Sequence, residues 1–280
     1  MEDRAKLKDA KKIVIKVGTS SLTQENGLVD ARKLDQIAEV FSFLVREGKT
    51  PLLVTSGAIA VGAAQMGFTQ RPTDLNEKQA LASIGQVELI NMYARSFSRF
   101  NLKVGQVLLT KDGITNPIRR ETTSSTLNTL LQMGVVPIIN ENDSVATDEI
   151  EIGDNDTLSA YTAVLVDADL LIILSDIDGL YTGDPRKNPD AHIIHKVPEL
   201  TPEIEQMASG STSEFAKGGM ITKILAAKIC VHNGTDLVIA RGDDINIIYR
   251  ILGGELIGTH FVSKPRLTNN GKKRYFFLGF

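Results

Sequence analysis

The chain has 280 residues, of which 42% are hydrophobic, and a formal net charge of −3, so it can bury a large core and carries no strong field for nucleic acid. Its single cysteine excludes an internal disulfide framework, and no apolar run reaches the roughly 18 residues that a membrane-spanning helix needs. Because the charged first residues also lack the apolar core of a signal peptide, we expect one soluble, cytoplasmic domain that binds neither membrane nor nucleic acid.

Short apolar runs rich in β-branched residues predict six buried strands. In chain order they are residues 12–18, 50–57, 102–110, 134–140, 169–176 and 236–242. Amphipathic segments between them predict helices, because their apolar residues recur every three or four positions. These segments are residues 30–47, 74–98, 119–133, 155–166 and 217–233. This alternation is typical of an α/β fold with a mostly parallel sheet and helices on both faces.

Two further short strands are expected near the end of the chain, at residues 258–263 and 273–280, in the form of an edge hairpin. No internal repeat, low-complexity tract or long linker divides the sequence. We therefore expect a single domain over residues 1–280.

The first two predicted strands both end in a glycine turn. The turns are KVG at residues 16–18 and TSG at residues 55–57. Ligands of open α/β sheets bind beyond such strand ends, and glycine turns let backbone N–H groups approach phosphate oxygens. Either turn taken alone is typical of an ordinary tight connection, whereas two such turns with a lysine at the first favour a phosphate site. Lys16 either reaches solvent at the strand end or holds an anionic ligand, because lysine is rarely buried without a partner.

The fourth strand leads into a segment rich in acids and amides, NENDSVATDEIEIGDND at residues 140–156. Its spacing differs from that of a calcium-binding loop. The part EIEI at 149–152 is typical of a solvated ribbon, whereas GDND at 153–156 directly precedes a predicted helix. Asn155 or Asp156 is therefore either the N-cap of this helix or part of a site that holds an ammonium group and orders lysines.

A second lysine that could face a ligand, Lys223, follows the fifth strand in the segment AKGGMITK at residues 216–223. Lys223 lies in the first turn of a predicted helix, where the helix dipole disfavours a cation. Either a bound anion offsets this penalty or Lys223 is a solvated surface residue. The four histidines show no metal-ligand spacing with Cys230, which is expected in the core.

Six motifs, taken in their order along the chain, resemble the amino acid kinase family over residues 11–262. They are VIKVGTSSLT, VTSGAIAVG, INENDSVAT, GDNDTLSA, SDIDGLYTGDPR and GGMITK. Two parts of these motifs, TSGAIA and NENDSVA, are similar to members that phosphorylate glutamate rather than to aspartokinase or acetylglutamate kinase. The resemblance implies a three-layer αβα sandwich and phosphoryl transfer from ATP, with Mg²⁺, to L-glutamate, which is the first step toward proline. It also implies a homo-oligomer, dimer or tetramer, and feedback inhibition by L-proline.

The resemblance further implies roles for individual residues. Lys16 and Lys223 neutralise the transferring phosphoryl group, and Asp156 orders both lysines. The implied glutamate contacts are Ser56, Gly57, Asp143 and Asn155. The implied ATP contacts are Lys16, Gly18, Ser175, Asp176, Lys217, Gly218, Gly219, Met220, Ile221, Thr222 and Lys223, with the loop at 181–186 beside the adenosine.

This chain departs from the family pattern in two places. Ala216-Lys217 stands where members usually have Gly-Thr, so Lys217 either adds a phosphate contact or faces solvent. Many members carry a C-terminal PUA domain, whereas residues 263–280 form only a basic extension, so no PUA domain is expected. Three other functions stay open: a kinase of the same fold with another substrate, a non-catalytic amino-acid sensor, and an RNA-binding module.

Overall fold

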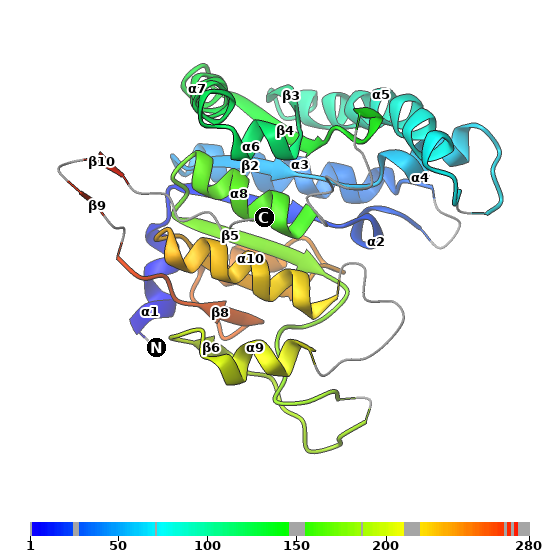
Figure 1. The fold of residues 1–280 in the computed structure, drawn as a ribbon. Helices are drawn as coiled ribbons and strands as arrows, with labels where there is room; N and C mark the ends of the chain where they lie inside the picture. The colour runs from blue at the N-terminus through cyan, green and yellow to red at the C-terminus, as the bar shows by residue number, and fades with distance from the viewer. Residues whose placement is uncertain are drawn as a thin grey trace.

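The central element of the computed structural model is one sheet with the strand order β3-β4-β2-β1-β5-β7-β8-β6 (Figure 1). The structure describes residues 2–24, 28–70, 72–145, 155–185, 187–209, 219–265, 268–269 and 272–273. The strands are β1 (Lys12–Val17), β2 (Thr50–Val54), β3 (Lys103–Leu109), β4 (Val135–Glu141), β5 (Leu170–Ser175), β6 (Lys196–Val197), β7 (Asp236–Arg241) and β8 (Thr259–Phe261). Neighbouring strands are parallel except for β7 and β8. All six predicted strands and the mostly parallel sheet are confirmed.

The expected edge hairpin at the end of the chain is wrong for its first strand. Residues 258–263 contain β8, but β8 lies inside the sheet between β7 and β6. The short strand β6 takes the edge position, and its two residues are too few for a strand signal in the sequence. Residues 274–280 lie outside the described part. A separate pair, β9 (Thr268–Asn269) with β10 (Lys272–Lys273), precedes them.

Helices cover both faces of the sheet, which confirms the three-layer αβα sandwich. On one face pack α3 (Ala31–Arg46), α5 (Leu75–Ser98) and α11 (Ile247–Leu252). On the other face pack α7 (Pro117–Gln132), α8 (Asn155–Leu165) and α10 (Met220–His232), and α8 and α10 lie in front of the sheet in Figure 1. The shorter helices are α1 (Glu2–Ala5), η1 (Lys6–Asp9), α2 (Thr19–Leu22), α4 (Ala58–Gln65), α6 (Lys111–Thr115), η2 (Asp143–Val145) and α9 (Pro202–Ser209).

Local sequence signals fix both ends of α3. The side chain of Asp30 accepts a hydrogen bond from the Arg32 backbone N–H, so Asp30 caps the first turn. Gly48 adopts a left-handed φ of 72° just after the helix, a conformation that glycine takes without a steric penalty. The apolar stripe between these ends is buried against the sheet, as its spacing predicts.

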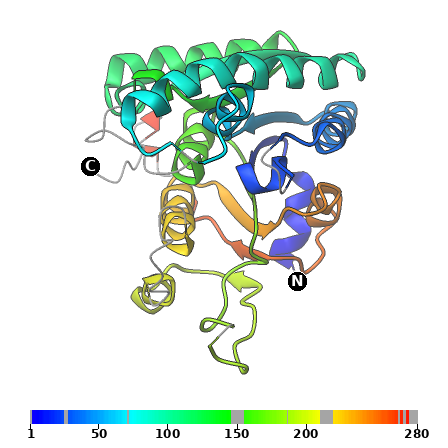
Figure 2. The same ribbon diagram turned by 90° about the vertical axis from the view of Figure 1, so that its right-hand side faces the viewer.

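The helices α4 and α5 pack backbone against backbone. A Cβ atom on Gly85 would lie 1.9 Å from the carbonyl oxygen of Ala58, and one on Gly62 would lie 2.0 Å from that of Leu81. Because no side chain fits in this contact, both positions require glycine. Since α4 follows the turn after β2, the contact ties that turn to α5. Figure 2 shows α5 at the β3–β4 end of the molecule, with β6 and α9 at the opposite end.

Candidate active site

A buried carboxylate joins two lysines at the carboxyl ends of the parallel strands. Asp156 Oδ1 lies 2.7 Å from Lys16 Nζ, and Asp156 Oδ2 lies 2.9 Å from Lys223 Nζ. Lys16 comes from β1, Asp156 from the first turn of α8, and Lys223 from the first turn of α10. Their exposed fractions are 6%, 0% and 4%. The structure therefore brings together the three residues expected to act on the phosphoryl group, and neither lysine is a solvated surface residue.

The N-cap interpretation of Asn155 and Asp156 is wrong. The helix α8 begins at Asn155, so both residues stand inside its first turn. Asp156 instead accepts from Lys223 Nζ and, at 3.3 Å, from the hydroxyl of Thr222. The side chain of Asp156 therefore contacts residues of β1 and α10 rather than the backbone of its own helix.

The electrostatics of this cluster favour a bound anion. Burial alone would raise the pKa of the Asp156 carboxyl, but the charges and hydrogen bonds of Lys16 and Lys223 outweigh it and hold the pKa below its ordinary value. Two ammonium groups held on one buried carboxylate concentrate positive charge at the strand ends, and this charge attracts an anionic ligand.

The two predicted glycine turns lie beside this cluster and beside each other. A Cβ atom on Gly18 would stand 3.4 Å from Lys16 Nζ. Gly57 has a left-handed φ of 102°, and a Cβ atom there would stand 3.5 Å from Thr19 Cγ2. Each turn begins a helix, α2 or α4, whose first N–H groups have no partner within the helix. Backbone donors therefore accompany the lysine, as a phosphate site requires.

Amides and a hydroxyl gather on the β2–β4 side of the cluster. Asn155 Nδ2 donates to the backbone carbonyl of Thr55, to Ser56 Oγ at 2.8 Å and to Asn140 Oδ1 at 2.9 Å. Asp143 begins η2 three residues beyond Asn140 and is half-buried. The structure thus places Ser56 in contact with Asn155, and places Asp143 on the segment that follows β4.

The residues expected to contact ATP lie at the end of β5 and the start of α10. Ser175 is buried and donates to Asp176 Oδ1 at 2.9 Å, while Asp176 is exposed. The register between β1 and β5 pairs Val17 with Leu174, so Ser175 lies one strand away from the Lys16 end of β1.

On the α10 side, the hydroxyl of Thr222 donates to the Gly219 carbonyl at 2.9 Å, and Met220 and Ile221 complete the first turn. Ala216, Lys217 and Gly218 lie outside the described residues, so the contact of Lys217 stays a prediction.

Sequence reasoning missed the groups that hold this site in place. The loop after β5 is fixed by Asp178, which accepts from Arg241 Nε and from the hydroxyl of Tyr181 at 3.0 Å. On the other side, Asn140 is hydrogen-bonded to the buried Gln86 of α5. The acid and amide run after β4 pointed to Asn140, but no pattern within α5 distinguishes Gln86 from an ordinary helix residue.

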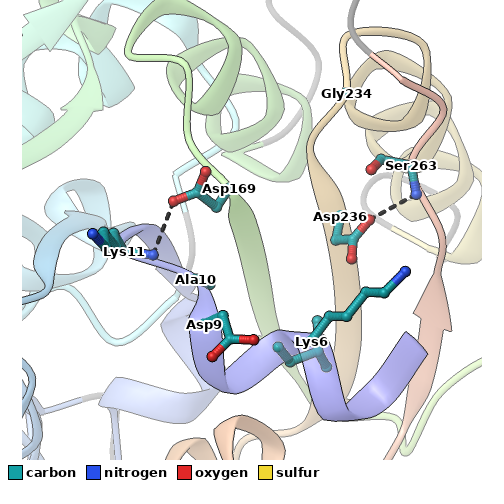
Figure 3. Close-up of a pocket in the computed structure, with 9 residues that line it drawn as sticks. Lys6, Asp9, Ala10, Lys11, Asp169, Gly234, Asp236 and Ser263 are labelled. Atoms are coloured by element: carbon teal, nitrogen blue, oxygen red, sulfur yellow. Dashed lines mark hydrogen bonds between the residues drawn. The ribbon is translucent and has the colours of Figure 1, made fainter. Parts of the chain in front are cut away.

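An open hollow of about 380 Å³ lies at the opposite edge of the sheet and contains none of the predicted site residues (Figure 3). Two carboxylates in its lining already serve the backbone at the amino ends of β5 and β7. Asp169 accepts from the backbone N–H groups of Lys11 and Lys12, and Asp236 accepts from that of Ser263. The hollow therefore has a structural explanation.

No helix in the described ranges is long and apolar enough to cross a membrane. They also contain no group of three or more histidine, cysteine, aspartate or glutamate side chains that could hold a metal ion. Cys230 is buried in the core as expected, and burial raises the pKa of its thiol.

The chain resembles known proteins in both sequence and fold. The sequence profile of the amino acid kinase family matches residues 11–241. A glutamate 5-kinase of Clostridium perfringens is 46% identical over 93% of this chain and 98% of its own length, and one of Listeria monocytogenes is 48% identical over 93% and 96%. Among solved structures, carbamate kinase from Giardia lamblia bound to AMP-PNP superposes with a TM-score of 0.64 at 17% identity. That match covers 92% of this chain and 100% of the kinase.

Proposed function

The chain belongs to the amino acid kinase family, and we propose that its strand-end site transfers the terminal phosphoryl group of ATP to the γ-carboxylate of L-glutamate. The product is γ-glutamyl phosphate, and the reaction is the first step of proline biosynthesis. The proposal rests on the contact between two groups of residues. We call them the phosphate half, which contains the lysine cluster, and the amide half, which contains Ser56 and Asn155. The cluster of Lys16, Asp156 and Lys223 meets the pair of Ser56 and Asn155 at the first turn of α8.

The chemistry needs charge neutralisation more than proton transfer. The γ-carboxylate of glutamate is already ionised at neutral pH, so no general base is required. A carboxylate oxygen attacks the γ-phosphorus, the bond from phosphorus to the bridging oxygen breaks, and its electron pair leaves with ADP. Lys16 and Lys223 compensate the negative charge on the transferring group, and Asp156 holds both ammonium groups in place.

We assign the amide half of the site to glutamate and the glycine turns to phosphate. Gly18 and Gly57 offer backbone N–H groups near Lys16, while Ser56, Asp143 and Asn155 receive the α-carboxylate and the ammonium group. Ser175 and Asp176, together with residues 217–223, border the nucleotide.

Mg²⁺ is expected on the phosphate oxygens of ATP with several waters, as this ion prefers. Lys16 and Lys223 suit such a complex, because ATP keeps a net negative charge when it binds one Mg²⁺. We assign no protein ligand to the ion.

The proposal also includes inhibition by L-proline and assembly of the chain into a homo-oligomer. L-Proline also carries an α-carboxylate and a positively charged amine, although its amine is secondary, so it would inhibit by occupying the amide half of the site. The chain would act as a homodimer or homotetramer of one kinase domain. Light scattering on the purified protein tests the oligomer, and a glutamate titration at fixed proline tests whether the inhibition is competitive.

The activity itself is tested with purified protein, Mg²⁺ and ATP against a panel of acceptors. The panel contains L-glutamate, D-glutamate, L-aspartate, N-acetyl-L-glutamate, carbamate and UMP, and hydroxylamine traps any acyl phosphate as a hydroxamate. We expect hydroxamate with L-glutamate alone. Turnover with another acceptor but not with glutamate would keep the fold and overturn the substrate. Binding of ATP without turnover of any acceptor would favour an amino-acid sensor, against which the intact lysine cluster argues.

Asp143→Ala is expected to raise the KM for glutamate at least about tenfold, because a charged hydrogen-bond partner of the substrate ammonium is lost. The kcat at saturating glutamate and the KM for ATP should change little, since Asp143 lies on the amide side of the site. Steady-state hydroxamate formation measures all three constants. Asp190→Ala, which removes an exposed carboxylate, is the control and should leave them unchanged. An unchanged glutamate KM in Asp143→Ala would remove Asp143 from the glutamate site.

A further inference from the structure

A chain of three side-chain amides runs from the helix α5 into the glutamate half of the site. Gln86 Oε1 accepts from Asn140 Nδ2 at 2.8 Å, and Asn140 Oδ1 accepts from Asn155 Nδ2 at 2.9 Å. Gln86 and Asn140 are buried, with exposed fractions of 8% and 2%. Gln86 lies on α5 next to Gly85, at the close contact with α4. These residues connect the scaffold of the molecule to Asn155.

The polarity of this chain is fixed at its inner end. The backbone carbonyl of Thr55 can only accept a hydrogen bond, so Asn155 must direct Nδ2 toward it. The same Nδ2 then needs an acceptor in Asn140, which directs its Oδ1 inward and its Nδ2 outward. Asn140 Nδ2 in turn needs the acceptor that Gln86 provides. Reversing any one of these amides would set two donors or two acceptors against each other.

This polarity determines what Asn155 offers to a substrate. Asn155 uses Nδ2 for its side-chain hydrogen bonds to described residues, which leaves Oδ1 as the remaining polar atom of the amide. Glutamate at neutral pH has a single group that donates hydrogen bonds, its ammonium, because both carboxylates only accept. An oxygen fixed at this position therefore selects for the ammonium group.

We propose that Gln86 is a positioning residue for substrate specificity: through Asn140 it holds Asn155 in the orientation that recognises the ammonium group of the amino acid. This inference rests on the proposed function, because it assumes that Asn155 lies at the glutamate site. A buried amide pair that served packing alone could be replaced by apolar side chains at little cost, whereas an amide chain with a required direction needs an acceptor at position 86.

The test compares a substrate with an analogue that lacks the ammonium group. Glutarate has both carboxylates of glutamate and no ammonium, so its inhibition constant reports binding without the proposed contact. In Gln86→Met, which removes the acceptor but keeps the bulk, we expect the glutamate KM to rise about tenfold. The inhibition constant of glutarate, the KM for ATP and kcat should each change less than about twofold. The variant Gln86→Glu keeps an acceptor oxygen, so its glutamate KM should lie within about threefold of the wild-type value.

Leu89→Met is the matched control, because Leu89 is a fully buried residue of α5 outside the amide chain. It should leave the ratio of the glutarate inhibition constant to the glutamate KM unchanged. Gln86→Leu replaces Gln86→Met if the methionine variant does not melt cooperatively. Equal loss of glutamate and glutarate binding, or no rescue in Gln86→Glu, would show that Gln86 only supports packing. If the wild type forms no glutamyl hydroxamate, the proposed function fails and the role of Gln86 fails with it. A wild type that turns over glutamate while Gln86→Met keeps its KM overturns the Gln86 role alone.

Discussion

Lys223→Ala is expected to lower kcat for glutamate phosphorylation by about 10³-fold while the KM for glutamate changes less than about twofold. The reason is that the Lys223 ammonium lies in the phosphate half of the site, 2.9 Å from Asp156 Oδ2 and away from the amides. Its charge is needed most when negative charge redistributes over the transferring phosphoryl group. Steady-state hydroxamate formation, with glutamate and ATP varied in turn, separates the two constants.

Lys228→Ala is the matched control on the same helix. Lys228 lies on α10 five residues beyond Lys223, is partly exposed, and bonds Glu205 Oε1 at 2.8 Å. Its removal should leave kcat and both KM values unchanged, because a surface ion pair contributes little and touches no substrate. A Lys223→Ala protein that is folded and retains wild-type kcat would exclude Lys223 from the chemical step.

Asp156→Asn is expected to lower the free energy of unfolding by about 3–5 kcal/mol, because it leaves two buried lysines without their shared counter-charge. For a chain of this size the melting temperature should fall on the order of 10 °C. ATP with Mg²⁺ should recover part of this loss, since its phosphates replace the missing negative charge beside Lys16 and Lys223. Thermal melting of the wild type and the variant, with and without the nucleotide, measures both effects.

The stability difference between wild type and Asp156→Asn should also depend on pH. The folded-state pKa of Asp156 lies below its ordinary value, so the carboxylate contributes its full stability above the ordinary pKa of about 3.9. This contribution is lost as the pH falls through the lower folded-state value. The two proteins should therefore converge in stability in acid and differ fully at neutral pH.

Asp112→Asn provides the control for this prediction. Asp112 is ion-paired with Arg119 at 2.6 Å, but both side chains are largely exposed, so its substitution should cost less than about 1 kcal/mol. A loss in Asp156→Asn as small as that in Asp112→Asn would show that Asp156 is not the counter-charge on which the two lysines depend.

The location of the site could be predicted from the sequence, because parallel strands align their carboxyl ends at one edge of the sheet. Knowing that Lys16 ends one strand and that Asp156 follows another was enough to expect them in one site. The residue pattern left the pairing of this acid with the lysines as one of two alternatives, and only the resemblance singled out Asp156, because the contact depends on how α8 and α10 pack. Gln86 could not be anticipated at all. Its role depends on a contact between a helix and a strand that are about fifty residues apart in sequence, and nothing in the local pattern of α5 records it.

The close contact between Gly62 and Gly85 has a mechanical consequence. Side chains between two helices usually absorb small shifts, but here the backbones of α4 and α5 touch directly, so a shift of one displaces the other. Ser56 and Gly57, which lead into α4, must then follow α5, whereas Lys223 follows α10. In the proposed function, the groups assigned to glutamate are therefore tied to α4 and α5, and the lysine assigned to the phosphoryl group is tied to α10.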